Sequence, residues 1–329
     1  MININANIPN ASVDTLNGKI KSTILKGVLN NKIVNQAFDL KLNKAVSFNG
    51  EVNTSLIPNT LVSNSTLNTS LANIMTKSTT VNLISDALTS DYEINVTDLN
   101  NLYDLTNTKL RGKLKLNGNI KQDKNLKIIG KTSILGGEVM FTLINDDLVS
   151  NAQSIQTKEL LYMMYYPVIF DSVAKSDVKY NLKSQKGTVL TILENGKILP
   201  NKYTNTIKNL TKFDLTREAY TDSTIKSTIN KKVIKSTVDM NSKNTEIDVP
   251  NSTIDLNKRT IIALVQTRLD NIEFDTNISG NLDKPKVKIQ TDKLIKSTVK
   301  TKLYKQVEEK INNKLGGDAV KSLLKGLFK

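Results

Sequence analysis

The sequence predicts a mainly β protein: a long, curved antiparallel sheet that forms an open apolar groove, followed by a C-terminal basic amphipathic helix. Three observations predict this fold. Apolar and polar residues alternate with period two from about residue 38 to 290. Ile, Val and Leu supply most of the 38% hydrophobic residues, whereas aromatic residues make up only 5%. Alternation over many successive segments is typical of an antiparallel sheet with one apolar face.

The clearest strand pattern lies at residues 110–120, where Leu114, Leu116 and Ile120 alternate with charged and amide residues. Similar alternation occurs at 139–143, 178–182 and 272–278. A weak repeat, apolar-x-Gly-x-apolar, recurs at 48–52, 110–114, 116–120 and 278–282. Because glycine inside a strand normally marks a bulge or a sharp bend, we expect these glycines to bend the sheet.

Three segments break the alternation. Residues 20–36 predict a short helix or two short strands, and residues 153–175 predict a short helical or plug insertion in an elongated β domain that spans 1–290. Within the insertion, Met163, Met164, Tyr165 and Tyr166 are interpreted as a packed plug, with a ligand contact as the alternative. The last segment, 291–329, predicts an amphipathic helix and tail, because apolar residues recur every four positions from Ile295 to Leu315 among many lysines.

Composition excludes most catalytic chemistry. The chain has no Cys, no His and no Trp, so it cannot form a histidine-based triad, a thiolate nucleophile or an imidazole or zinc-cluster metal site. The adjacent carboxylates Asp146-Asp147 and Glu308-Glu309 point to different sides of a strand or helix and form no acid/base pair. We therefore expect no enzyme activity, no metal and no cofactor.

The positive charge suggests which partners are compatible. Lys and Arg number 46 against 31 Asp and Glu, giving a net charge of +15. Nearly all of it is lysine, whereas proteins that read nucleic acid favour arginine forks and aromatic platforms. We expect no nucleic-acid partner. A lysine coat suits an anionic membrane surface, or solubility alone.

The sequence shows neither a membrane span nor a leader. The longest uncharged apolar stretch, 160–170, is about half the ~20 residues that a bilayer crossing needs. The first ten residues lack the pattern of a signal peptide and look like the middle of a strand. We expect the chain to be a fragment, or its anchor to lie upstream.

Residues 272–289 resemble a segment of a known protein family. The run Ser279-Gly280-Asn281-Leu282-Asp283-Lys284-Pro285-Lys286-Val287 follows a strand. It resembles the C-terminal signature of the AsmA-like proteins (the AsmA/TamB type), a strand followed by Ser/Thr-Gly-x-Leu-x-x-Pro-x-Val. The basic helix and the closing residues 324–328 are also similar to that family's tail. The resemblance covers roughly residues 100–329. It implies a repeating β-groove fold in the periplasm and a role in phospholipid movement and outer-membrane biogenesis.

Together these observations predict a non-enzymatic envelope protein that binds or conducts phospholipid along an apolar groove between inner and outer membranes. The expected location is periplasmic, with an inner-membrane anchor absent from this chain and envelope proteins as further partners. The residues expected to line the groove are Leu114, Leu116, Ile120, Val139, Phe141, Leu143, Tyr180, Leu182, Leu190, Ile192, Phe274 and Ile278. Those expected to contact an anionic membrane are Lys293, Lys296, Lys300 and Tyr304.

Two alternatives remain open at this point. A structural or adhesive β-rich surface protein would also be rich in Asn, Ser and Thr, but its apolar faces would close into a core. The C-terminal helix could cap an open end of the sheet, keeping its lysines in water, instead of contacting a membrane.

Overall fold

The structure is a computed structural model that describes residues 1–38, 41–270, 272–282, 284–290 and 293. These residues contain 18 strands, all in one antiparallel sheet, which confirms the mainly β class. The chain divides into two compact units, Met1–Thr191 and a second that begins at Ile192. The predicted C-terminal helix lies outside the described residues, apart from Lys293.

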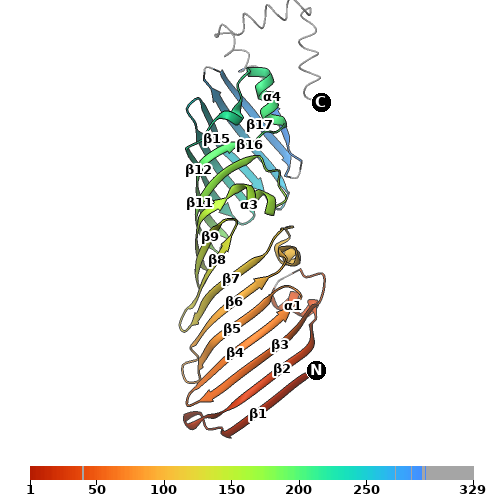
Figure 1. Ribbon diagram of the computed structural model, residues 1–329, viewed down its shortest axis with the longest axis vertical. Helices are drawn as coiled ribbons and strands as arrows, with labels where there is room; N and C mark the ends of the chain where they lie inside the picture. Colours follow the sequence, from red (N-terminus) through yellow and green to blue (C-terminus); the bar gives the residue numbers. More distant parts are fainter. Residues whose placement is uncertain (39–40, 271, 283, 291–292, 294–329) are drawn as a thin grey trace, which may run out of the picture. The chain divides into compact units, whose positions relative to one another are not determined.

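The first unit is a meander in which successive strands pair side by side (Figure 1). Its strands are β1 (Ile2–Asn10), β2 (Asn17–Leu29), β3 (Val46–Ile57), β4 (Thr60–Thr69), β5 (Asn73–Asn82), β6 (Leu88–Val96), β7 (Leu114–Gln122), β8 (Leu126–Ile134), β9 (Gly137–Ile144), β10 (Asp147–Gln156), β11 (Phe170–Asn181) and the first half of β12 (Lys186–Ile198). Short helices interrupt it: η1 (Val13–Thr15), α1 (Asn31–Phe38), η2 (Leu99–Leu102), α2 (Tyr103–Thr106) and α3 (Thr157–Met163).

Two of the irregular segments can now be described. Residues 20–29 continue strand β2, and a helix, α1, begins at Asn31, so this segment is a strand followed by a helix. Within 153–175, β10 ends at Gln156 and α3 follows directly. Thr157 anchors α3, because its hydroxyl accepts a hydrogen bond from the backbone N–H of Ser172 at 2.8 Å.

Strand pairing sorts the side chains onto two faces of the sheet in the first unit. Directly paired residues of an antiparallel sheet project to the same side, so the registers carry each face from strand to strand. One face, here called the apolar face, carries aliphatic, aromatic, Gly, Ser and Thr residues. The other, the polar face, receives the charged residues Lys19, Lys21, Glu51, Lys77, Asp91, Glu93, Lys115, Lys121, Lys127, Lys131, Glu138, Asp147, Lys175, Asp177 and Lys179.

Bulges interrupt this register at non-glycine residues. Lys26 in β2, Ser78 in β5 and Ser154 in β10 have positive φ angles of 54°, 51° and 58° and lie at shifts in pairing. Asparagines on the polar face satisfy two of the freed amides: the N–H of Lys26 donates to Asn49 Oδ1, and that of Ser78 to Asn64 Oδ1, both at 2.9 Å. Part of the asparagine richness therefore serves to hold the bulges.

The repeated glycines are expected to mark bulges or sharp bends. Gly50 pairs with Leu67 in β4 and with Ile24 in β2, at the edge of the register shift in β2. Gly118, however, marks no bulge, because it lies in regular pairing opposite Tyr92 and Gly130. The physical reason is space above the sheet. A Cβ atom at Gly118 would lie 2.6 Å from the Tyr92 ring, and one at Gly130 would lie 2.2 Å from the Phe141 ring. Gly118 and Gly130 make room for aromatic rings from neighbouring strands.

The second unit has its own short meander and a helical cover. Its elements are the end of β12, α4 (Lys202–Thr211), η3 (Leu215–Arg217), β13 (Asp222–Asn230), β14 (Val233–Asn241), β15 (Thr245–Asp255), β16 (Thr260–Leu269), β17 (Ile272–Asn281) and β18 (Lys286–Ile289). Its charged residues again share one face: Lys226, Lys235, Asp239, Glu246, Asp248, Arg268, Glu273, Asp275, Lys286 and Lys288.

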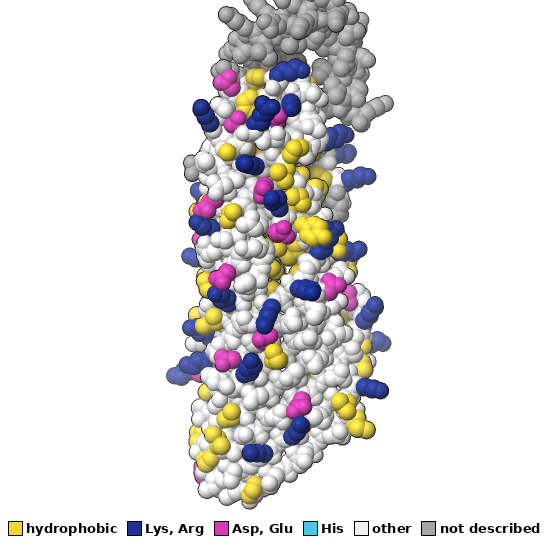
Figure 2. All heavy atoms as spheres, in the orientation of Figure 1, with side chains coloured by type: hydrophobic (Ala, Val, Ile, Leu, Met, Phe, Trp, Pro, Cys, Tyr) yellow, Lys and Arg dark blue, Asp and Glu magenta, His cyan; other side chains and the backbone are white. Residues whose placement is uncertain are grey.

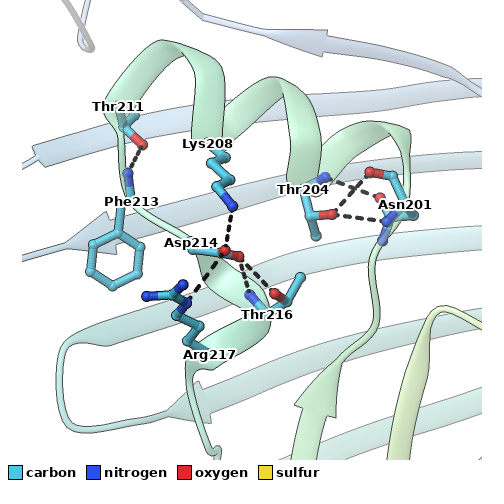
Figure 3. Close-up of polar contacts among 8 residues, drawn as sticks. All are labelled: Asn201, Thr204, Lys208, Thr211, Phe213, Asp214, Thr216 and Arg217. Carbon is cyan, nitrogen blue, oxygen red and sulfur yellow. Dashed lines mark hydrogen bonds and ion pairs between the residues drawn. The ribbon is translucent and has the colours of Figure 1, made fainter.

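Polar contacts fix the ends of α4 (Figure 3). Asn201 Oδ1 accepts from the N–H groups of Tyr203 and Thr204, while the Asn201 N–H donates to the Thr204 hydroxyl, forming a capping box. Beyond the other end, Asp214 binds Lys208 Nζ at 2.8 Å and accepts from the Thr216 hydroxyl at 2.7 Å. These contacts lower the pKa of Asp214 to about 2, the Lys208 bond being the largest cause.

A dry core lies beneath α4 and η3. Ile207, Leu215 and Leu269 are fully buried, and Phe274 and Ile289 are packed with them. These sheet residues belong to the apolar face of the second unit, so the helices close over that face at one end of its strands.

Candidate functional site: the apolar face of the first unit

Two aliphatic rows run across the strands of the apolar face. The first row joins paired residues of β1 to β7: Ile2, Ile24, Leu67, Ile74, Ile94 and Leu116, with Gly50 at the β3 position. The second row joins Leu56, Leu61, Val81 and Leu88 of β3 to β6. From Ile94 to Leu88 the rows are six residues apart along β6, or roughly 20 Å at 3.3 Å per residue.

A further aliphatic and aromatic row continues the face to β11. Ile120 pairs with Ile128, Ile128 with Leu143, Leu143 with Leu148, and Leu148 with Tyr180. Neighbouring strands lie about 4.8 Å apart, so a five-strand row is a continuous apolar strip about 19 Å long.

Small hydroxyl residues fill the band between the two aliphatic rows. They pair with one another across the strands: Thr54 with Ser63 at 2.9 Å, and Ser65 with Thr76 at 2.8 Å. A further pair, Thr79 with Ser90, lies at 2.7 Å. In each pair one hydroxyl donates to the other, so each pair satisfies one O–H donor on the sheet. These short side chains add less bulk than the aliphatic side chains in the rows on either side.

Aromatic rings lie over glycines on this face. Tyr92 rests over Gly118, and its hydroxyl donates to the Ile129 carbonyl at 3.0 Å. Burial raises the pKa of the Tyr92 hydroxyl, which stays a neutral donor. Phe141 lies over Gly130, and Phe48 lies over Gly27 in the same manner. Tyr92 is only 8% exposed, so of these three rings it is Phe48 and Phe141, both half-buried, that contribute to the exposed apolar surface.

The apolar face of the first unit stays partly open to solvent. Leu67, Ile94, Leu116 and Phe141 are half-buried, and Val52 is 37% exposed. Helix α3 packs against β10 and β11, and no second sheet covers the face among the described residues. Apolar side chains that are half-exposed on an uncharged face can contact an apolar ligand.

Most of the predicted groove residues lie on this face. The registers place there Leu114, Leu116, Ile120, Val139, Phe141, Leu143 and Tyr180. Leu182 lies in the turn after β11 and is 45% exposed. Ile278 lies on the corresponding face of the second unit, opposite Ala263 and Val287.

Two predicted groove residues require correction. Leu190 and Ile192 lie on the polar face, because the Thr191 hydroxyl bonds the Ser176 hydroxyl at 2.6 Å and so places Thr191 on the apolar face between them. In β12 the apolar residues Val189, Leu190, Ile192 and Leu193 fall on both faces, so alternation alone could not decide which face points inward.

Phe274 is on the expected face, but it is only 1% exposed and packs in the core beneath α4. It therefore lies in a closed core. Three of the predicted membrane-contact residues, Lys296, Lys300 and Tyr304, lie outside the described residues. The fourth, Lys293, pairs with Asp275 at 2.6 Å.

Sequence reasoning missed several residues that complete the face, namely Tyr92, Ile94, Ile128 and Leu148. Ile128 and Leu148 fill the gaps between predicted residues on β7, β9 and β11. The sequence pattern could have identified Ile128, since Leu126, Ile128 and Gly130 alternate with lysines and an isoleucine. Strand pairing is what joins them to the others.

The polar face differs in chemistry. Cross-strand ion pairs such as Lys21 with Glu51 at 3.0 Å and Lys115 with Glu93 at 3.1 Å lie on it. A hollow of about 680 Å³ near the bulges of β2 and β5 has polar-face amides in its lining, including Asn49, Asn53 and Asn64. Figure 2 shows basic and acidic side chains interspersed over the visible surface. Charge is thus spread over the surface without a single-sign field on this view.

Comparison with protein-family models, with curated proteins and with solved structures finds no match to the chain. No helix among the described residues is long and apolar enough to cross a bilayer.

Proposed function

We propose that this protein binds the acyl chains of phospholipid along the apolar face of its sheet and conducts lipid from strand to strand, without enzymatic chemistry. The observation that carries the proposal is the separation of the faces: in the first unit the aliphatic rows, the rings and the hydroxyl band share one uncharged, partly open face.

The energetics favour an apolar cargo. A two-tailed lipid has about 30 methylenes, and each exposed methylene costs about 0.8 kcal/mol in water, so the tails carry a penalty of roughly 24 kcal/mol. A strip of aliphatic side chains can remove much of this penalty while the headgroup stays in solvent. The strip runs across strands, so a chain sliding along it exchanges equivalent contacts at each step.

This function agrees with the resemblance to AsmA-like proteins, and we extend the proposal to that membership and to a periplasmic location between two membranes. The rival function, a structural or adhesive protein with a closed core, is favoured by one feature, the helical cover of Phe274 in the second unit. The first hypothesis predicts bound lipid on the apolar face of the first unit, and the rival hypothesis predicts none.

Lipid content tests the proposal. Protein purified under mild conditions should yield phospholipid in solvent extracts analysed by mass spectrometry. Leu116→Asp, which places a charge on the apolar face, should lower the lipid content severalfold. Ile129→Asp on the neighbouring strand is the matched control, because Ile129 lies on the polar face and is 41% exposed.

The same two variants separate an open face from a closed core. An unpaired charge in a dry core costs several kcal/mol, whereas a carboxylate on an open face keeps water. Thermal unfolding of Leu116→Asp close to that of Ile129→Asp supports the open face. Protein that is always empty of lipid, or that unfolds with Leu116→Asp alone, would contradict the proposal.

A further inference from the structure

A second surface, distinct from the apolar face, surrounds Arg111 just before β7. The Arg111 guanidinium lies over two tyrosine rings, 3.7 Å from the centroid of Tyr165 and 4.5 Å from that of Tyr162. The Arg111 N–H donates to the Met163 carbonyl at 2.9 Å, and Nη1 donates to the Tyr162 carbonyl at 3.4 Å. These bonds fix the segment before β7 against the end of α3.

The tyrosines belong to an exposed apolar run. Tyr162 is 56% exposed, Tyr165 and Ile169 are 48% exposed, and Tyr166 and Val168 are also exposed. We call these five residues together with Arg111 the Arg111 surface. A space-filling view shows hydrophobic side chains gathered in the region of α3 with basic side chains beside them (Figure 2). Exposed apolar residues that gather in one patch mark interaction sites.

The backbone holds the tyrosines of this surface in a tight turn after α3. Tyr165 has a φ angle of +61°, a left-handed conformation that a bulky side chain rarely adopts. The Tyr166 N–H donates to the Leu161 carbonyl at 2.9 Å, which helps to hold the turn after α3. The strained conformation is thus retained at the residue whose ring lies nearest to Arg111.

Charge indicates the chemistry of the partner. Arg111 forms no ion pair within the part of the chain that the structure describes, so its charge is held between rings without a carboxylate. Lys109 and Lys113, two residues away on either side, are exposed. Tyrosine and arginine are suited to the membrane interface, where a ring sits at headgroup depth and a cation binds phosphate.

From this combination we propose that the Arg111 surface docks on an anionic phospholipid bilayer, with the tyrosine rings at headgroup depth and Arg111 bound to lipid phosphate. The proposal goes beyond lipid binding along the apolar face, and neither depends on the other. A soluble protein partner is the competing occupant, and the experiment below separates it from a bilayer.

Fluorescence offers a direct test, because the chain contains no tryptophan. In the full chain, Tyr162→Trp places a single reporter on the Arg111 surface, and Ile84→Trp is the matched control, at a turn residue 71% exposed between β5 and β6. Vesicles of phosphatidylcholine containing phosphatidylglycerol should shift the Tyr162→Trp emission to the blue. Spin-labelled lipid in those vesicles should quench it.

Three outcomes support docking: the Ile84→Trp emission stays unchanged, salt releases the protein, and Arg111→Gln in the Tyr162→Trp background weakens vesicle binding about fivefold, the effect of one interfacial charge. An unshifted Tyr162→Trp emission would overturn the proposal, as would equal binding to pure phosphatidylcholine or equal shifts at both reporters. Lipid content of the apolar face is measured separately by mass spectrometry, so failure of either proposal is recognised independently.

Discussion

The ring of Tyr92 on β6 lies across Gly118 of β7, where a Cβ atom would come within 2.6 Å of it. The Tyr92 hydroxyl reaches over β7 to the Ile129 carbonyl on β8 at 3.0 Å. One side chain thus spans three strands, and it can do so only because the middle strand has glycine at that position. The glycine in β7 therefore determines where the Tyr92 ring lies on the apolar face.

Filling this glycine position should destabilise the first unit. In Gly118→Ala the new Cβ would also lie 1.9 Å from the Ile129 carbonyl oxygen, which is backbone and cannot move aside easily. We expect a loss of about 1–3 kcal/mol, measured by urea unfolding. Gly50→Ala is the control, since its Cβ would meet the flexible Leu67 side chain at 3.2 Å, and we expect its effect to be within about 0.5 kcal/mol. Equal stability of the two variants would contradict this role of Gly118.

The alternation of residues predicted the class of the fold and most of the candidate face, because in β7 and β9 apolar residues occupy one side and charged or polar ones much of the other. Alternation could not identify the inward face where the residues on both sides of a strand are apolar. In β12, the Ser176–Thr191 bond assigns Leu190 to the polar face. Such a bond depends on strand register, which the alternation of a single strand does not determine.

The sequence pattern also could not predict that a helix covers Phe274. Helix α4, whose sequence is rich in Thr and Asn, has low intrinsic helix propensity. Its capping box and the burial of Ile207 against the sheet stabilise it instead. The Asn201-to-Thr204 spacing was a usable signal for the helix start, but it does not reveal which sheet residues the helix covers.

The hydroxyl pairs should behave as coupled units. Removing one member, by Thr54→Val or Ser63→Ala, leaves the other without its 2.9 Å partner and should cost about 1 kcal/mol. The double variant should cost little more than either single variant. Denaturant unfolding of all four proteins gives the coupling energy, expected at about 0.5–1 kcal/mol. Strict additivity of the two losses would show that the hydroxyls do not interact.

The Asp214 contacts predict a pH dependence in the second unit. The folded-state pKa of Asp214 is lowered from 3.8 to about 2, mainly by Lys208. A lowered carboxyl pKa stabilises the folded state above the unfolded value, so this contribution is complete above about pH 4 and is lost as pH falls through about 2. NMR titration of the Asp214 carboxyl gives the pKa. In Lys208→Met the midpoint should rise towards 3.8, and an unchanged midpoint would exclude Lys208 as the cause.

The Lys293–Asp275 pair should stabilise the end of the described chain. Lys293→Ala leaves Asp275, whose side chain is 11% exposed, without its 2.6 Å partner. The lysine is itself half-exposed, so we expect a loss of roughly 1 kcal/mol in thermal or urea unfolding. Lys288→Ala, an exposed lysine on the polar face of β18, should have less effect. Identical effects of the two substitutions would argue against a specific pair.

Photocrosslinking at two adjacent residues of β9 tests the central claim most directly. Phe141 lies on the apolar face and Met140 on the polar face, where it is 46% exposed. A photoreactive amino acid replaces one or the other, the protein is incubated with phospholipid vesicles and irradiated, and the adducts are identified by mass spectrometry. Lipid binding along the apolar face predicts acyl-chain adducts at position 141 and few at 140. Adducts that are equal at both positions, or confined to position 140, would contradict it.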